Sequence, residues 1–162
     1  MMDGHNCQVF KTHSAQETLA FGEALGRSLL GGLVLGLVGP LGAGKTQLVK
    51  GIALGNGLED VRQVTSPTFT LVHEYPGRLA LHHIDAYRLR GPQDLASLGF
   101  DELIQADAAV VVEWADRARA LISPDALWIT IAPTAEQQRS LAFEAGGTLA
   151  FECLNRLQQL RV

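Results

Sequence analysis

A run of eight residues in the first third of the chain has the composition of a phosphate-binding loop. The run consists of Gly39, Pro40, Leu41, Gly42, Ala43, Gly44, Lys45 and Thr46. Its glycines allow backbone N–H groups to approach a triphosphate closely, where a side chain would block the approach. Lys45 is placed to bridge the β- and γ-phosphates as a binding and catalytic residue, and the Thr46 hydroxyl is placed to bind Mg²⁺. We therefore expect this loop, together with Gln47 in the helix that follows, to bind ATP and Mg²⁺.

An acidic residue at the end of an apolar run is the candidate for a second metal ligand. Residues 109–112 are apolar and lead directly into Glu113. Because P-loop enzymes usually hold Mg²⁺ with an acid at the end of a neighbouring strand, Glu113 is the predicted partner of Thr46. The alternative is a glutamate that only marks where a buried strand reaches solvent. Trp114 comes next, and it either lies near the nucleotide base or packs against the core.

Asp85 is a second acid at the end of a predicted strand, directly after Leu81-His82-His83-Ile84. Open α/β sheets bind their ligands at the carboxyl ends of strands, so Asp85 could position the attacking water or accept its proton. It could instead cap a turn toward Tyr87. His82 and His83 are adjacent and point to opposite faces of a strand, which argues against joint metal binding.

Residues 65–68 place three hydroxyl groups around one proline. P-loop proteins often carry a γ-phosphate-sensing switch at such a segment, and Thr68 is its candidate catalytic hydroxyl. A turn stabilised by serine and threonine hydroxyls, leading into a strand, is the alternative. Arg88, Arg90 and Arg117 are candidates for binding phosphate or a partner's carboxylate.

The apolar pattern predicts the elements that position these residues. Ser14 and Glu17 form a capping box at the start of a helix over 14–30. Strands are predicted at 33–38, 69–75, 79–85, 108–112, 127–132 and 140–144, and further helices at 47–54, 92–99, 100–105 and 148–160. We expect one α/β domain over 1–162, a P-loop NTPase-type three-layer sandwich with a mixed, mostly parallel sheet and an antiparallel edge.

Composition limits the classes of function. The net charge of -4 and a pI near 5.7 argue against a broad basic surface, so we expect any contact with tRNA to be indirect. Cys7 and Cys153 stand far apart and suggest neither a disulfide framework nor a zinc site, which favours a reducing cytoplasm. The apolar stretch 31–38 is too short to cross a bilayer, and no signal peptide is expected at the N-terminus.

The motifs in this order resemble the TsaE (YjeE-like) family, the small ATPase of bacterial tRNA threonylcarbamoyladenosine biosynthesis. Besides the loop, the resemblance rests on Ser66-Pro67-Thr68-Phe69-Thr70-Leu71-Val72-His73-Glu74-Tyr75, His83-Ile84-Asp85-Ala86-Tyr87-Arg88-Leu89, Leu98-Gly99 and Val112-Glu113-Trp114-Ala115-Asp116-Arg117. It covers roughly residues 14–139, and residues 142–162 carry no matching motif.

The resemblance implies roles for several residues and for partner proteins. Thr46 and Glu113 would hold Mg²⁺, Lys45 and the loop amides would hold ATP, and Asp85 would lie at the catalytic centre. The family works with TsaB and with TsaD, which transfers the threonylcarbamoyl group to adenosine 37 of tRNAs reading codons that begin with adenine. ATP hydrolysis by the family is needed for that cycle but does not itself join the group to tRNA.

Three functions are compatible with these residues. The first is an ATPase that turns over slowly alone, because no arginine finger is evident to stabilise charge on the γ-phosphate. The second is an adaptor in which ATP binding, not hydrolysis, docks the chain onto TsaD and TsaB. The third is a small-molecule kinase, which would need an arginine-rich lid to clamp an acceptor phosphate. Arg88 and Arg90 alone give little support for such a lid.

Overall fold

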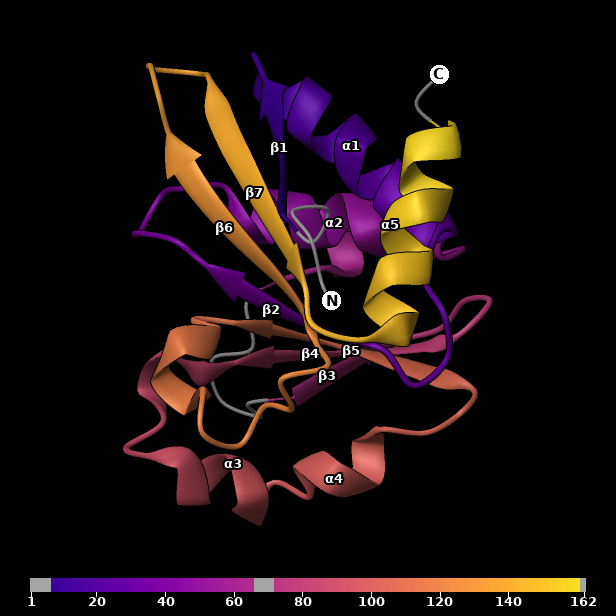
Figure 1. The fold of residues 1–162 in the computed structure, drawn as a ribbon, viewed down its shortest axis with the longest axis vertical. Helices are drawn as coiled ribbons and strands as arrows, with labels where there is room; N and C mark the ends of the chain where they lie inside the picture. The colour runs from indigo at the N-terminus through magenta and orange to yellow at the C-terminus, as the bar shows by residue number, and fades with distance from the viewer. Residues whose placement is uncertain (1–6, 66–71, 161–162) are drawn as a thin grey trace.

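The computed structural model describes residues 7–65 and 72–160, which form a mixed sheet with helices on both faces (Figure 1). The strands within these residues are β1 (Cys7–Thr12), β2 (Val34–Val38), β3 (Val72–Tyr75), β4 (Ala80–Asp85), β5 (Ala108–Glu113), β6 (Leu127–Pro133) and β7 (Arg139–Ala145). The α-helices are α1 (Ala15–Arg27), α2 (Lys45–Gly55), α3 (Pro92–Ser97), α4 (Phe100–Leu103) and α5 (Thr148–Leu160). Short 3₁₀ turns are η1 (Val61–Gln63), η2 (Ala86–Arg88) and η3 (Ala115–Ala118).

The sheet has the strand order β1-β7-β6-β2-β5-β4-β3 among the described residues. Its four central strands, β6, β2, β5 and β4, are parallel. Antiparallel strands lie at both edges, with β3 on one side and β7 and β1 on the other. The predicted mixed α/β class is therefore confirmed, with antiparallel pairing at two edges where one was expected.

Helices α1, α2 and α5 cover one face of the sheet, and α3 and α4 cover the other, as Figure 1 shows. Because side chains alternate along a strand, Leu35 and Leu37 of β2 pack in the first layer while Val34 packs in the second. All six positions of β5 are buried, which explains its continuous apolar sequence. The two layers enclose two separate apolar clusters, one on each side of the central strands.

The predicted capping box opens α1 in a slightly shifted form. The Ser14 hydroxyl accepts a hydrogen bond of 3.0 Å from the backbone N–H of Glu17, as expected. The Glu17 carboxylate accepts from the backbone N–H of His13 at 2.5 Å, one residue before the N-cap. Both interactions satisfy backbone donors at the start of the helix, which packs against α2, α5 and β1.

One difference from the prediction concerns the first described strand. Strand β1 was not predicted; it pairs with β7, from Cys7 opposite Glu144 to Thr12 opposite Arg139. The strand predicted at 140–144 and the helix predicted at 148–160 are present as β7 and α5, and the buried Cys153, Leu154 and Leu157 of α5 join the first apolar cluster. In the described part of the chain, no helix is long and apolar enough to cross a membrane.

Candidate nucleotide-binding site

Three parallel strands end at the same edge of the sheet and deliver the candidate site residues there. The glycine loop follows β2, Glu113 is the last residue of β5, and Asp85 is the last residue of β4. The register places Glu113 beside Leu37 on one side and beside Asp85 on the other. The carboxyl edge of the sheet thus brings the loop and both acids together, as predicted.

The glycines of the loop are required by its backbone. Gly42 and Gly44 have φ angles of 78° and 104°, a conformation that L side chains rarely adopt. A Cβ on Gly39 would lie 2.5 Å from the carbonyl oxygen of Ile131 on β6, so this position is limited by space. Gly44 is also the N-cap of α2, which places the positive end of that helix at the loop.

Lys45 has a nearly buried side chain that contacts the loop itself. Its Nζ donates hydrogen bonds to the carbonyl oxygens of Gly39 and Pro40, at 2.6 and 2.8 Å. The same ammonium lies 3.9 Å from the ring centroid of Trp114. Burial lowers the pKa of Lys45 below its ordinary value, and the carboxylates of Glu113, Asp116 and Asp85 partly offset this effect. The ammonium is thus held at the pocket by neutral acceptors and by an aromatic face.

Glu113 is buried and hydrogen bonded through both oxygens. Its Oε1 accepts from the Thr46 hydroxyl at 3.0 Å, and its Oε2 lies 2.5 Å from Nε2 of His83. Only 3% of Glu113 is exposed, so it does not mark a point where the strand reaches solvent. The structure thereby joins the two predicted metal ligands, Thr46 and Glu113, across the pocket.

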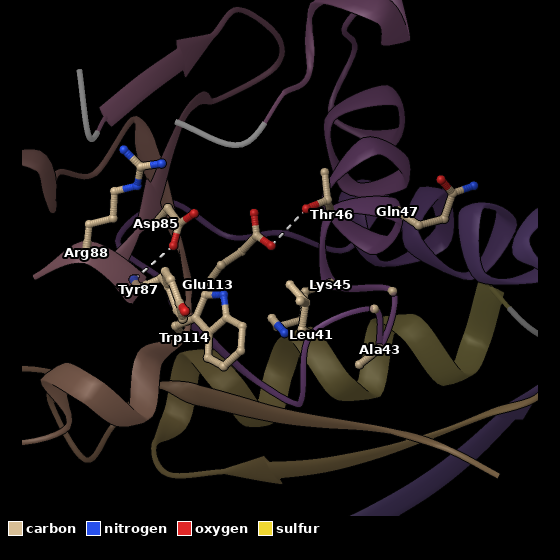
Figure 2. A pocket seen from close by; sticks show the side chains of 12 residues that line it. Leu41, Ala43, Lys45, Thr46, Gln47, Asp85, Tyr87, Arg88, Glu113 and Trp114 are labelled. Atoms are coloured by element: carbon tan, nitrogen blue, oxygen red, sulfur yellow. Dashed lines mark hydrogen bonds between the residues drawn. The ribbon is translucent and has the colours of Figure 1, made fainter. Parts of the chain in front are cut away.

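Asp85 lies at the other acid position, with its carboxylate near Glu113 (Figure 2). Its Oδ1 accepts a hydrogen bond of 2.9 Å from the backbone N–H of Tyr87 and caps η2. Asp85 therefore caps the turn, which is the alternative role given above. Its catalytic role stays a prediction. Burial raises the pKa of the Asp85 carboxyl above its ordinary value, and the charge of Glu113 adds to this rise.

Trp114 and Tyr87 form an aromatic wall beside Lys45, as Figure 2 shows. Their ring centroids are 4.9 Å apart, and the guanidinium of Arg117 lies 4.7 Å from the centre of the Tyr87 ring. Trp114 has a φ of 57°, a positive value that no other non-glycine residue has in the described ranges. Such strained backbone is concentrated at functional sites, where surrounding contacts hold it. Trp114 thus lines the pocket together with Tyr87 and also packs against the second apolar cluster, and its contact with a nucleotide base stays a prediction.

The pocket has a volume of about 360 Å³. It is lined by Leu41, Gly42, Ala43, Gly44, Lys45, Thr46, Gln47, Asp85, Tyr87, Arg88, Glu113 and Trp114. Gly39 and Pro40 shape the loop behind it through the bonds to Lys45. The Gln47 side chain turns toward α1 and donates to the carbonyl of Ala15 at 3.1 Å. Thr68 and the rest of the predicted switch beyond Thr65 lie outside the described residues.

Sequence reasoning missed three features of the site. Arg139, the first residue of β7, donates to the carbonyl oxygens of the glycine loop. His83 and Tyr75 extend the hydrogen bonds of Glu113 away from the pocket. From the sequence, His83 was weighed as a metal ligand and was not paired with Glu113. The burial of His83 and the register of β4 against β5 are the features that bring the two side chains together.

The donor set fits a magnesium ion better than a softer metal. Mg²⁺ prefers oxygen ligands and retains several waters, and it is commonly held by one carboxylate, one hydroxyl and substrate phosphates. Thr46 and Glu113 supply that pair of oxygens within hydrogen-bond distance of one another. No cluster of three or more His, Cys, Asp or Glu residues suited to a metal occurs in 7–65 and 72–160. A site that depends on phosphate oxygens needs no such cluster.

The fold and the loop define the class as an α/β protein of the P-loop type. Residues 12–141 match the family described as "Threonylcarbamoyl adenosine biosynthesis protein TsaE". The chain therefore belongs to the TsaE family, which takes part in tRNA threonylcarbamoyladenosine biosynthesis.

Individual relatives agree with this placement. A "tRNA threonylcarbamoyladenosine biosynthesis protein TsaE" from Treponema pallidum is 39% identical over 80% of this chain and 95% of its own length. The protein of the same name from Bacillus subtilis is 37% identical over 85% of both chains. The crystal structure of Bacillus subtilis YdiB superposes with a TM-score of 0.80 at 30% identity, covering 96% of this chain and 97% of YdiB.

Proposed function

We propose that this chain is a Mg²⁺-dependent ATPase that supports threonylcarbamoylation of adenosine 37 in tRNAs reading codons that begin with adenine. It would act in the cytoplasm with TsaD and TsaB and would meet tRNA only through them. The observation that carries the proposal is the hydrogen bond between Thr46 and Glu113, because it joins the phosphate loop to a strand-end acid beside Lys45. Membership of the TsaE family connects this site to tRNA modification.

Each side chain has a separate task in this proposal. When bound, Mg²⁺ would neutralise charge on the phosphate oxygens, and Thr46 and Glu113 would hold it. Lys45 would exchange the carbonyls of Gly39 and Pro40 for phosphate oxygens, which are stronger acceptors for an ammonium. Asp85 would orient the attacking water or accept its proton, since it lies in the same pocket.

Slow turnover by the isolated chain is part of the proposal. Among arginines around the loop, Arg139 donates to loop carbonyls and Arg117 lies over the Tyr87 ring. Arg88 is the arginine that lines the pocket among the described residues. The proposal assigns Arg88 no contact with the γ-phosphate, whose charge is then under-stabilised, and we expect a partner to supply or order the missing group.

One observation supports a second candidate, the nucleotide-gated adaptor. The carboxylate of Asp85 accepts from the backbone N–H of Tyr87, which is a structural task that needs no chemistry. If ATP binding alone docks the chain onto TsaD and TsaB, an Asp85→Asn variant would lose hydrolysis and still support full tRNA modification. Asn keeps the side-chain oxygen, so it preserves the cap and tests the chemistry alone.

The deciding experiment measures Mg²⁺-dependent ATP hydrolysis by the purified chain, alone and with TsaB and TsaD. Lys45→Ala and Glu113→Ala are compared with wild type and with Lys11→Ala and Glu59→Ala, which change exposed residues of the same types. We expect partner-stimulated turnover in wild type and both controls, and its loss in both site variants. Nucleotide binding without turnover in the complete mixture would favour the adaptor and remove the catalytic role of Asp85.

A further inference from the structure

A line of hydrogen bonds leads from the candidate metal site to Thr65. Nε2 of His83 lies 2.5 Å from Oε2 of Glu113, and Nδ1 of the same ring lies 3.0 Å from the Tyr75 hydroxyl. The Tyr75 hydroxyl in turn donates to the carbonyl oxygen of Thr65 at 3.3 Å. We call Glu113, His83 and Tyr75 the buried relay, and it ends at the backbone carbonyl of Thr65. It runs across β5, β4 and β3 in the order in which they lie in the sheet.

The relay fixes the orientation of the Glu113 carboxylate. One carboxylate oxygen bonds Thr46 and the other bonds His83, so rotation of the group would break both contacts. The side chains are 4% exposed for Glu113 and fully buried for His83, so breaking their contact would leave buried polar groups without a strong partner. A residue that orients a metal ligand from behind commonly governs how well that ligand binds the metal.

Tyr75 gives the relay a defined far end. Only 3% of Tyr75 is exposed, and burial raises the pKa of its hydroxyl to about 12, so the hydroxyl keeps its proton. A phenol hydroxyl has a single proton, so it donates to Thr65 while Nδ1 of His83 carries a proton; with Nε2 donating to Glu113 and Nδ1 bare, the same proton goes to His83. Nδ1 of His73 also lies 3.3 Å from the same oxygen. The Thr65 carbonyl therefore lies within hydrogen-bond distance of a β3 hydroxyl that keeps its proton.

We propose that His83 and Tyr75 are positioning residues that couple the Mg²⁺ site at Thr46 and Glu113 to the backbone at Thr65. His83 orients the carboxylate of Glu113 toward Thr46. Tyr75 links His83 to the Thr65 carbonyl, so a change at one end of the relay affects the other. The inference rests on the proposed function, because it assigns roles at the same site. A plain structural pair would instead stabilise the sheet and leave the Mg²⁺ dependence of nucleotide binding unchanged.

The test compares binding of a fluorescent, non-hydrolysable ATP analogue without Mg²⁺ and across a Mg²⁺ titration. The variants are His83→Leu, His83→Gln, which keeps a donor, and Tyr75→Phe, which removes one hydroxyl. His82→Leu is the matched control, since it changes the neighbouring histidine on the opposite face of β4. For His83→Leu we expect the half-saturating Mg²⁺ concentration to rise by about tenfold or more, with Mg²⁺-free binding nearly unchanged.

A double-mutant comparison separates positioning from folding. If His83 acts through the Glu113 carboxylate, His83→Leu will add little to the Mg²⁺ defect of Glu113→Gln. His83→Gln should recover part of the Mg²⁺ response, and Tyr75→Phe should show a smaller defect. Should His83→Leu fail to fold, Tyr75→Phe and His83→Gln carry the comparison. Additive Mg²⁺ defects, or single variants that bind Mg²⁺ and nucleotide as wild type does, would overturn the inference.

The coupling to Thr65 has its own readout. We expect the amide NMR signals of Val64 and Thr65 to shift when the Mg²⁺–analogue complex forms in wild type, and to shift much less in Tyr75→Phe. Equal shifts in both proteins would contradict the coupling. If wild type shows no Mg²⁺-dependent nucleotide binding at all, the proposed function fails; if wild type responds and the His83 variants respond equally, only this inference fails.

Discussion

Nε of Arg139 donates a hydrogen bond of 2.8 Å to the carbonyl oxygen of Ala43, 96 residues away in the sequence. Nη2 reaches the carbonyl of Gly42 at 3.5 Å, while Nη1 donates to carbonyls of the turn between β6 and β7. In a trans peptide the carbonyl and the next N–H point in opposite directions. Holding the Ala43 carbonyl against Arg139 therefore directs the Gly44 N–H away from it.

We predict that Arg139→Gln weakens ATP binding by about tenfold, because a hydrogen bond to a charged donor contributes about 1.5–3 kcal/mol. The loop would lose the contact that fixes its peptide orientation, and each ATP molecule would have to order it. Isothermal titration calorimetry with ATP and Mg²⁺ measures the loss. Arg156→Gln is the control, since Arg156 forms an exposed i,i+4 pair on α5. Equal affinity in both variants would show that Arg139 has no such role.

We predict that Asp85→Asn stabilises the nucleotide-free protein at neutral pH. Because the pKa of Asp85 is raised in the folded state, the native protein binds more protons than the unfolded chain between the ordinary and the raised value. The unfolding free energy of wild type therefore falls as the pH rises through that window. At higher pH this loss of stability stays constant. Asn removes this ionisation while it keeps an acceptor for the Tyr87 N–H.

Urea unfolding of both proteins from about pH 4 to about pH 8 checks this sign. The advantage of Asp85→Asn should be largest at the upper end and should shrink as the pH falls below the raised pKa. Asp107→Asn is a control from an exposed position. An Asp85→Asn protein that is less stable than wild type at neutral pH would mean that the carboxylate stabilises the fold in its charged form.

The parts of the site that sequence predicted are those with a local signal. The loop is defined by glycines at 39, 42 and 44, whose need for space or positive φ is visible in the backbone. Glu113 and Asp85 were found because each ends a predicted strand, and parallel strands end at one edge. In such cases neighbouring residues in the chain determine the geometry.

The parts that sequence did not predict depend on residues far apart in the chain. Arg139 meets Ala43 through the pairing of β7 with β6 and of β6 with β2, which no local pattern encodes. Strand β1 exists because β7 offers it an edge, and its exposed Val9 weakens the apolar alternation. The relay likewise needs the register of three strands, so its pairs could be recognised only after the sheet order was known.

We predict that the fluorescence of Trp114 reports nucleotide binding. The Lys45 ammonium lies 3.9 Å from the indole centre, and transfer of this cation to a phosphate would change the field on the ring. The chain has two tryptophans, so Trp128→Phe leaves Trp114 as the sole emitter. ATP with Mg²⁺ should change its emission in that variant, and the response should be lost when Lys45→Ala is added. A response that persists without Lys45 would assign the change to another contact.

The last prediction concerns Gly51, where α2 crosses α1. A Cβ at this position would lie 2.2 Å from the carbonyl oxygen of Leu19, so the two backbones are as close as glycine permits. Alanine favours a helix over glycine by about 1 kcal/mol, which alone would stabilise α2. The clash is with backbone, which cannot move aside as a flexible side chain does, and overpacking of this kind costs about 1–3 kcal/mol or more.

We therefore expect Gly51→Ala to lower the unfolding free energy by about 1–2 kcal/mol, because the steric cost exceeds the gain in helix propensity. Since α2 begins at Lys45, a displaced helix would also shift Lys45 and Thr46, and ATP affinity should fall together with stability. Denaturant unfolding and ATP titration measure the two effects, with Lys50→Ala in the same helix as control. A stabilised Gly51→Ala protein would show that α1 can yield, and the close crossing would then not be what positions the phosphate loop.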